Sequence, residues 1–124
     1  MDALWVGTGG FAGAVARYLL GRWVMGATGA AFPVGTLVVN GSGALLMGTV
    51  VALLAGRAAT DPARLLLVVG FLGGYTTLSA FARETIGLIE DGRWGAAVAY
   101  LALTNGIGLL ACAAGLVIGR AILR

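Results

Sequence analysis

The amino-acid sequence predicts an all-α membrane protein with four transmembrane helices, the third of them broken near its middle. Hydrophobic residues make up 60% of the 124-residue chain and charged residues only 10%, a balance far from that of water-soluble domains of this size. Four apolar stretches each approach the roughly 20 residues that a helix needs to cross a bilayer. The connections between them are short, so we expect one transmembrane domain over residues 1–124.

Segments that favour turns or the membrane interface separate the four expected helices. We expect the helices at residues 4–25, 32–55, 65–88 and 95–118. The connections GATGAA, GRAATDPAR and IEDGRW supply glycine, proline and charges, which are typical of turns and interfaces. The first helix follows Asp2 rather than a basic segment, so we interpret it as a retained span and not as a cleaved signal.

An arginine stands inside the first predicted helix, in GGFAGAVARYLLGRW. A central arginine costs on the order of 2.5 to 3.5 kcal/mol to insert, so Arg17 either faces protein or water, or extends along the helix to the interface. Both placements stay open. Gly9 and Gly13 have the small-xxx-small spacing that lets two helix backbones approach closely. The same spacing recurs in Ala44 with Gly48 and in Gly115 with Gly119.

An asparagine lies near the middle of the second predicted helix, FPVGTLVVNGSGALLMGTVVALLA. At that depth the side-chain amide of Asn40 needs a partner. The amide either bonds to a neighbouring helix, which is worth roughly 0.6 to 2 kcal/mol, or offers its NH₂ group to a passing solute. The sequence leaves both uses open.

The third predicted helix carries weak helix formers in GFLGGYTTLSAF. The glycine pair at 73–74 and the β-branched pair Thr76–Thr77 predict a break, and non-helical backbone at that depth must be buried in protein or line an aqueous cavity. Carbonyl groups freed at a break suit a small cation such as Na⁺, whereas freed N–H groups and hydroxyls suit an anion. The alternative is a simple kink, with the threonines bonded back to the preceding turn.

The fourth predicted helix contains NGIGLLA at 105–111, a short echo of NGSGALL at 40–46. The match is too short to indicate a repeat. Cys112 is the only cysteine and lies in the same apolar run, so we expect a small buried residue without a disulfide or a thiolate metal site.

The arginines leave the orientation in the membrane open. An even number of helices puts both termini on one side, where the nearby arginines are Arg57, Arg64, Arg120 and Arg124. The other side has Arg22, Arg83 and Arg93. This near balance is a weak signal under the positive-inside rule. A dimer with one subunit in each orientation, related by a two-fold axis in the membrane plane, is compatible with it.

The composition excludes several classes of function. The chain has no histidine and no lysine, which removes imidazole acid-base chemistry, the usual zinc ligand and Schiff-base chemistry. We therefore expect no enzyme. The arginines form no basic block, so nucleic-acid binding is not expected either. The lipid bilayer is the partner that the composition indicates.

Three motifs in order, GGFAGAVARY, VGTLVVNGSGALLMG and GFLGGYTTLSAF, are together highly specific. By them the chain resembles the Fluc fluoride channels, also called the CrcB family, over nearly its whole length. The resemblance implies a multi-pass protein of the cell inner membrane that assembles as an antiparallel, dual-topology homodimer. It also implies two separate pores for passive fluoride export, and a structural sodium ion at the dimer centre.

The resemblance assigns roles to individual residues. Asn40 matches the pore asparagine, and Arg17 matches the arginine near the pore entrance. The backbone carbonyls of Gly73 and Thr76 match the positions that hold the sodium ion, a pair from each subunit. Thr77, beside them, is placed with the fluoride pore.

The remaining pore residues lie on the third and fourth predicted helices. Phe81 matches the second of two pore phenylalanines, whose ring edges line the path. Leu78 replaces the first of them and has no positive ring edge to offer an anion. Ser79 matches a pore hydroxyl, and Tyr100 and Thr104, one helical turn apart, resemble the polar face of the fourth helix.

Two alternatives come from other classes of protein. A small four-helix proton-coupled multidrug exporter has a similar size, but it needs a membrane-embedded carboxylate. We expect the acidic residues at or near helix ends and loops, and they are Asp2, Asp61, Glu84, Glu90 and Asp91. A scaffold subunit without transport would account for the small-residue faces, but it leaves Asn40 and the broken helix unexplained.

Overall fold

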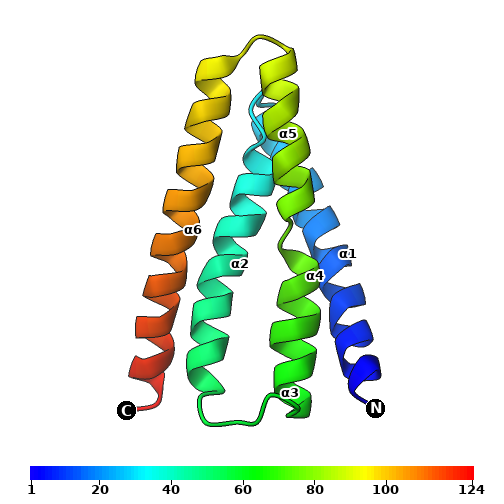
Figure 1. Cartoon of the computed structure of the whole chain (residues 1–124), viewed down its shortest axis with the longest axis vertical. Coiled ribbons are helices and arrows are strands. Elements are labelled where there is room, and N and C mark those ends of the chain that lie inside the picture. Colours follow the sequence, from blue (N-terminus) through cyan, green and yellow to red (C-terminus); the bar gives the residue numbers. More distant parts are fainter.

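The fold consists of helices only, in a computed structural model that describes residues 1–124. The elements are α1 (Asp2–Thr28), α2 (Val34–Leu53), α3 (Pro62–Arg64), the π-helical η1 (Leu65–Leu72), α4 (Gly73–Tyr75), α5 (Leu78–Glu90) and α6 (Trp94–Ile122). The segment from α3 to α5 forms one rod that is interrupted at residues 76–77. Figure 1 shows this rod between α1 and α2, with α6 beyond α2 and both termini at the same end.

Three segments are long and apolar enough to cross a membrane, and they are Val34–Leu53, Pro62–Glu90 and Trp94–Ile122. They overlap the expected spans 32–55, 65–88 and 95–118. The remaining helix, α1, is 27 residues long but less apolar than α2 or α6, because glycines, two arginines and an aspartate interrupt its apolar residues. The expected span 4–25 is therefore helical, while its crossing of the membrane remains a prediction.

Turn residues set the helix ends. Gly29, after α1, has a φ of 57°, which residues with a side chain rarely adopt. Asp61 caps the interrupted rod, because its carboxylate accepts the amide hydrogens of Ala63 at 2.9 Å and Arg64 at 3.4 Å. A side-chain oxygen at this position satisfies amide groups that have no partner within the helix.

Glycine brings α1 into direct backbone contact with the interrupted rod. A Cβ atom built on Gly9 would collide with the carbonyl oxygen of Leu66, and one on Gly13 with the carbonyl oxygen of Phe71. The small-xxx-small spacing of Gly9 and Gly13 therefore packs two backbones together, as predicted.

The helices α2 and α6 meet in the same way. A Cβ atom on Gly48 would collide with the carbonyl oxygen of Cys112, and one on Gly115 with that of Leu45. The predicted packing role of Gly48 and Gly115 is thus confirmed. The molecule consequently consists of two tight helix pairs, α1 with the interrupted rod and α2 with α6.

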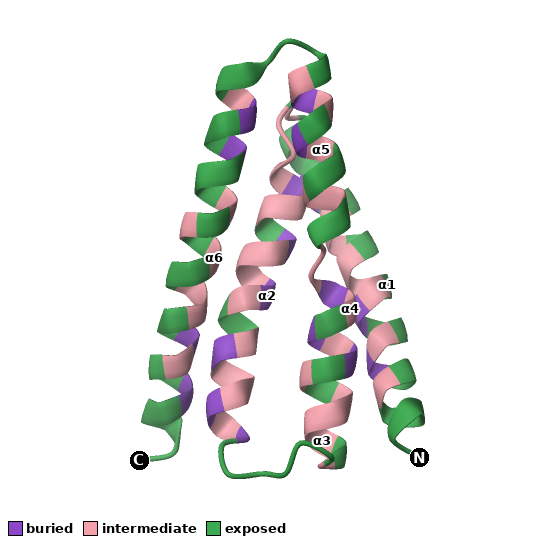
Figure 2. Ribbon diagram, viewed as in Figure 1, coloured by how far each residue is buried: buried purple, intermediate pink, exposed green.

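Much of the apolar surface is uncovered in the single chain. Only 18 of the 124 residues are buried, and Figure 2 shows the outer side of α6 almost wholly exposed. Leu109 and Leu110 on α6 are each 74% exposed, and Leu78 at the interruption is 77% exposed. Apolar area of this extent needs lipid or another protein surface against it.

Replacing Gly13 with alanine tests the backbone contact. The added methyl group would overlap the Phe71 carbonyl, so we expect the free energy of unfolding in detergent to fall by about 1 to 3 kcal/mol. Gly7→Ala is the matched control on the same helix, because nothing lies within 4 Å of the Cβ it would add. Thermal unfolding followed by circular dichroism measures both, and equal midpoints would contradict the contact.

Candidate functional site

Two threonines form the interruption of the rod. Thr76 and Thr77 are extended, with ψ of 156° and 116°, far from the value of an α-helix. Thr76 closes the upstream helix, since its amide and its hydroxyl both donate to the carbonyl of Leu72, at 3.1 Å and 3.0 Å. Thr77 opens α5, because its Oγ1 accepts the amide hydrogen of Ala80 at 3.2 Å. The sequence TT therefore ends one helix and caps the next.

Asn40 on α2 bonds to the backbone of the interruption with both ends of its amide. Its Nδ2 donates to the Thr77 carbonyl at 3.0 Å, and its Oδ1 accepts the Thr77 amide hydrogen at 2.8 Å. The structure thus supports the first of the two uses open from sequence, a bond to a neighbouring helix. A side-chain amide has two N–H donors, so one N–H of Asn40 is left over after these bonds.

The rest of the NGSG motif also holds the interruption. The Oγ of Ser42 lies 2.8 Å from the hydroxyl of Tyr75, which is buried at the end of α4. Gly43 leaves room for the side chains opposite it, because a Cβ there would press on the methyl group of Thr76 and the ring of Tyr75. The motif on α2 is therefore a docking surface for residues 75–77.

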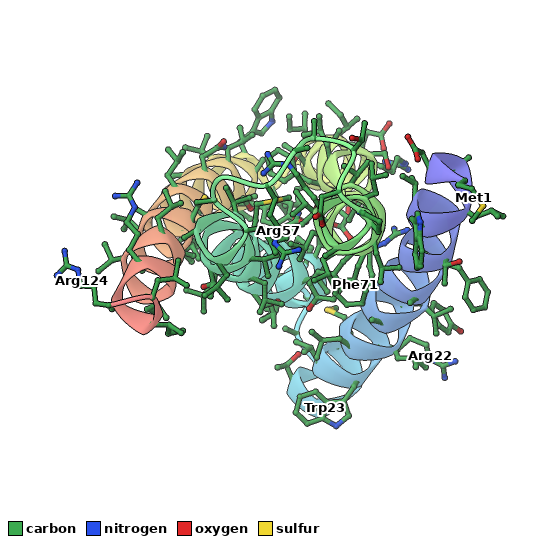
Figure 3. All side chains as sticks on the ribbon, turned by 90° about the horizontal axis from the view of Figure 1, so that it is seen from below. Met1, Arg22, Trp23, Arg57, Phe71 and Arg124 are labelled. Atoms are coloured by element: carbon green, nitrogen blue, oxygen red, sulfur yellow. The ribbon has the colours of Figure 1, made fainter.

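Arg17 reaches the same place from α1. Its Nε donates to the carbonyl of Gly74 at 3.2 Å, one of the carbonyls at the C-terminal end of α4 that lack a helical partner. The half-buried Arg17 therefore faces protein, which decides between the two placements left open by the sequence. Arg22 differs: Figure 3 shows it on the outer side of α1, and it donates to the Tyr18 hydroxyl at 2.9 Å.

Two cavities lie on the side of the interruption that carries Arg17. The larger, of about 570 Å³, is lined among others by Arg22, Arg93, Glu84 and Asp91. The smaller, of about 90 Å³, reaches Thr77. Both are lined by Arg17, Gly21, Gly35 and Thr36, so the two cavities adjoin.

A groove of about 260 Å³ lies on the other side of Thr77. Its lining is Asn40, Thr76, Thr77, Leu78, Phe81, Thr104 and Asn105. No charged side chain contributes to it. The hydroxyl of Thr104 is buried there without any hydrogen-bond partner, although buried polar atoms are normally paired. The groove is therefore lined by a residue with an unpaired hydroxyl, Thr104, and by Asn40, whose amide has one N–H left over.

The carboxylate group of Glu84, which the sequence placed near the end of a span, lies in α5, toward the Glu90 end of the interrupted rod. Glu84 accepts hydrogen bonds from the Thr36 hydroxyl at 2.7 Å and the Tyr100 hydroxyl at 2.6 Å. Tyr100 is fully buried and packs on Phe81 with 5.1 Å between ring centroids. Neither Thr36 nor the hydrogen bonds of Glu84 were predicted from the sequence; the available signal was a carboxylate inside the expected span 65–88.

A family described as "CrcB-like protein, Camphor Resistance (CrcB)" matches residues 4–116. The chain belongs to this family. Three relatives are each named "Fluoride-specific ion channel FluC". The relative from Rhizobium meliloti is 43% identical over 95% of both chains, and the one from Acidobacterium capsulatum is 40% identical over 98% of both. The relative from Sorangium cellulosum is 44% identical over 94% of this chain and 92% of its own.

In this CrcB-family chain most of the expected site residues meet at one place. The groove brings together Asn40, Thr76, Thr77, Leu78, Phe81 and Thr104. Arg17 lines the two cavities on the other side of Thr77. Ser79 does not line the groove; it is exposed, with its hydroxyl 3.4 Å from that of Thr77. Tyr100 lies behind Phe81, and Gly73 is exposed on α4.

Exchanging Arg17 for methionine tests its contact with the interruption. Methionine keeps the apolar stem but removes the bond to Gly74, so we expect the free energy of unfolding to fall by about 1.5 to 3 kcal/mol. Arg22→Met removes a bond between exposed side chains and should change stability by no more than about 0.5 kcal/mol. Thermal unfolding in detergent compares the two, and a milder effect at Arg17 than at Arg22 would contradict the assignment.

Proposed function

We propose that this protein is a fluoride channel through which fluoride leaves the cell passively, across the inner membrane. One observation carries the proposal: the groove at the interrupted helix presents unused neutral donors and no charged side chain. The names of the relatives support fluoride as the ion. Passive conduction requires no catalytic group.

The donors in the groove suit a small, strongly hydrated anion. A selective pore must replace much of the ion's water shell, while each site stays weak enough for the ion to leave. The leftover N–H of Asn40, the hydroxyl of Thr104 and the edge of the Phe81 ring are modest donors of this kind. A full positive charge among them would bind fluoride too tightly for rapid release.

The charges that attract fluoride stand at the entrance instead. The large cavity is lined by Arg17, Arg22 and Arg93 against Glu84 and Asp91, an excess of one positive charge. A cleft of net positive charge raises the local concentration of anions, in a manner that depends on ionic strength. We therefore assign the large cavity as the vestibule and Arg17 as the residue between vestibule and groove.

A second copy of the chain, inserted in the opposite orientation, would cover the open side of the groove. Leu78 lines the groove yet is 77% exposed, so the single chain leaves this wall incomplete. The near balance of arginines at the two ends is compatible with both orientations. The proposed assembly is an antiparallel homodimer of four transmembrane helices per subunit, with one pore along each subunit's groove.

Sodium is the cation that we propose at the centre of this dimer. Its ligands would be the carbonyls of Gly73 and Thr76, one pair from each subunit, since carbonyl oxygens suit a hard cation. Gly73 fits the role because it is exposed, and the nearest atom to a Cβ built on it is 4.0 Å away. The ion would be structural, and its charge would also favour anions nearby.

The exporter alternative has one structural feature in its favour, the half-buried carboxylate of Glu84 within the apolar span Pro62–Glu90. Two hydroxyl groups already donate to both of its oxygens. These bonds take two of the roughly four acceptor positions of the carboxylate. The names of the relatives make the channel the better-supported function.

Fluoride efflux from liposomes tests the proposed function. Vesicles with the purified protein should release trapped fluoride within seconds to minutes, when a potassium ionophore clamps the membrane potential, and a fluoride electrode follows the release. Asn40→Asp should abolish release, because it sets a carboxylate in the anion path. Release no faster than from protein-free vesicles would refute the channel, and coupling of release to a proton gradient would favour the exporter.

Replacing Leu78 with phenylalanine probes the incomplete aromatic wall of the groove. A phenyl ring would add a positive edge toward the anion, so we expect fluoride efflux to stay intact or to rise. Leu78→Ile is the matched control, with the same volume and no ring. The same electrode assay compares the two, and loss of efflux in the phenylalanine variant alone would contradict the prediction, because the ring would then obstruct the path.

A further inference from the structure

We infer that Asn40 is a positioning residue for the cation as well as a donor in the anion groove. By taking the amide hydrogen of Thr77, it keeps the Gly73 carbonyl free to bind sodium. The inference rests on the proposed function, because the cation belongs to that proposal. It adds that the anion groove and the cation site share one side chain.

The first step is a backbone bond that the interruption lacks. In a continuous α-helix each amide donates to the carbonyl four residues earlier, so the Thr77 amide would donate to Gly73. In this structure it donates to Oδ1 of Asn40 at 2.8 Å. Because Thr76 is extended, with ψ of 156°, the Thr77 amide has left the Gly73 oxygen, and the bond to Asn40 holds it away.

The Thr76 carbonyl also lacks its helical donor, because a side chain accepts that donor's hydrogen. The helical donor for the Thr76 carbonyl would be the amide of Ala80, and this amide donates instead to Oγ1 of Thr77 at 3.2 Å. The two carbonyls proposed to bind sodium are therefore ones whose helical donors have been taken by side chains, Asn40 in one case and Thr77 in the other.

The third step is that Asn40 contacts both the backbone of the interruption and the groove. Its Nδ2 donates to the Thr77 carbonyl at 3.0 Å, which fixes the amide plane against the backbone. The remaining N–H belongs to a residue that lines the groove together with Phe81 and Thr104. A change that removes the Asn40 acceptor for the Thr77 amide should consequently alter the cation site and the anion path together, whereas a change at Ser42 should alter only stability.

Sodium-dependent thermal stability measures the cation site without measuring transport. Purified protein in detergent is unfolded in sodium chloride and in N-methyl-D-glucamine chloride at equal ionic strength. Since a ligand that binds only the folded state raises the midpoint of unfolding, wild-type protein should show a higher midpoint in sodium. Asn40→Leu should lose this sodium-dependent rise, because leucine cannot accept the Thr77 amide hydrogen.

Two further variants separate an effect on the cation site from a general effect on stability. Asn40→Asp keeps an oxygen for the Thr77 amide but loses the donor to the Thr77 carbonyl, so it should keep part of the sodium-dependent rise while losing fluoride efflux. Ser42→Ala removes the contact with Tyr75 but leaves the Thr77 amide on Asn40. It should lower the midpoint in both salts equally and keep the rise.

A second pair of variants tests the same idea if Asn40→Leu does not fold. Thr77→Val is nearly isosteric but cannot accept the Ala80 amide hydrogen, so it should lose most of the sodium-dependent rise. Thr77→Ser keeps the hydroxyl and should retain it. A folded Asn40→Leu or Thr77→Val protein with the full wild-type rise would overturn the inference.

The failures of the inference and of the proposed function are distinguishable. Wild-type protein that conducts fluoride but shows no sodium-dependent rise would remove the cation assignment, and this inference with it, while leaving the channel. Wild-type protein that does not release fluoride would remove the proposed function itself.

Discussion

The pair of hydrogen bonds between Asn40 and Thr77 is the interaction on which the rest of the site depends. Hydrocarbon supplies no partner for an open backbone group, so an interrupted helix persists in a membrane only where side chains or neighbouring helices satisfy it. Asn40 supplies an acceptor to the Thr77 amide and a donor to its carbonyl. Both backbone groups of the residue that leaves the helix are thereby satisfied, and the groove beside them can stay open.

The helix faces that hold the interruption follow from simple spacing. Residues four apart share one face of a helix, and Gly9, Gly13 and Arg17 form such a row on α1. The two glycines touch the backbone of η1, so the third member of the row falls beside Gly74. On α2, Thr36 and Asn40 form the corresponding row, directed at Glu84 and Thr77. Backbone contact made possible by glycine thus determines which polar groups can reach the interruption.

The parts of this arrangement that sequence could predict are those with a local cause. Weak helix formers predict the interruption, and small-residue spacing predicts the close helix pairs. The network of Thr36, Glu84 and Tyr100 joins three helices, and no periodicity in any one of them reveals how they meet. The sequence could not predict that both ends of the Asn40 amide bond to Thr77, because this depends on where the Thr77 backbone turns. The π-helical turns of η1 have no marker in a run of leucine and valine.

The separation of charge from the groove supports the proposed conduction of an anion by a chain with so few polar residues. Arginine lines only the two cavities on one side of Thr77, while the groove on the other side is neutral. An ion drawn into the vestibule by long-range attraction would then meet only donors whose strength is short-ranged. If the arginine stood in the groove itself, attraction and release would conflict at one point. Its bond to Gly74 fixes Arg17 to the backbone at this boundary, where it would attract an anion in the proposed channel.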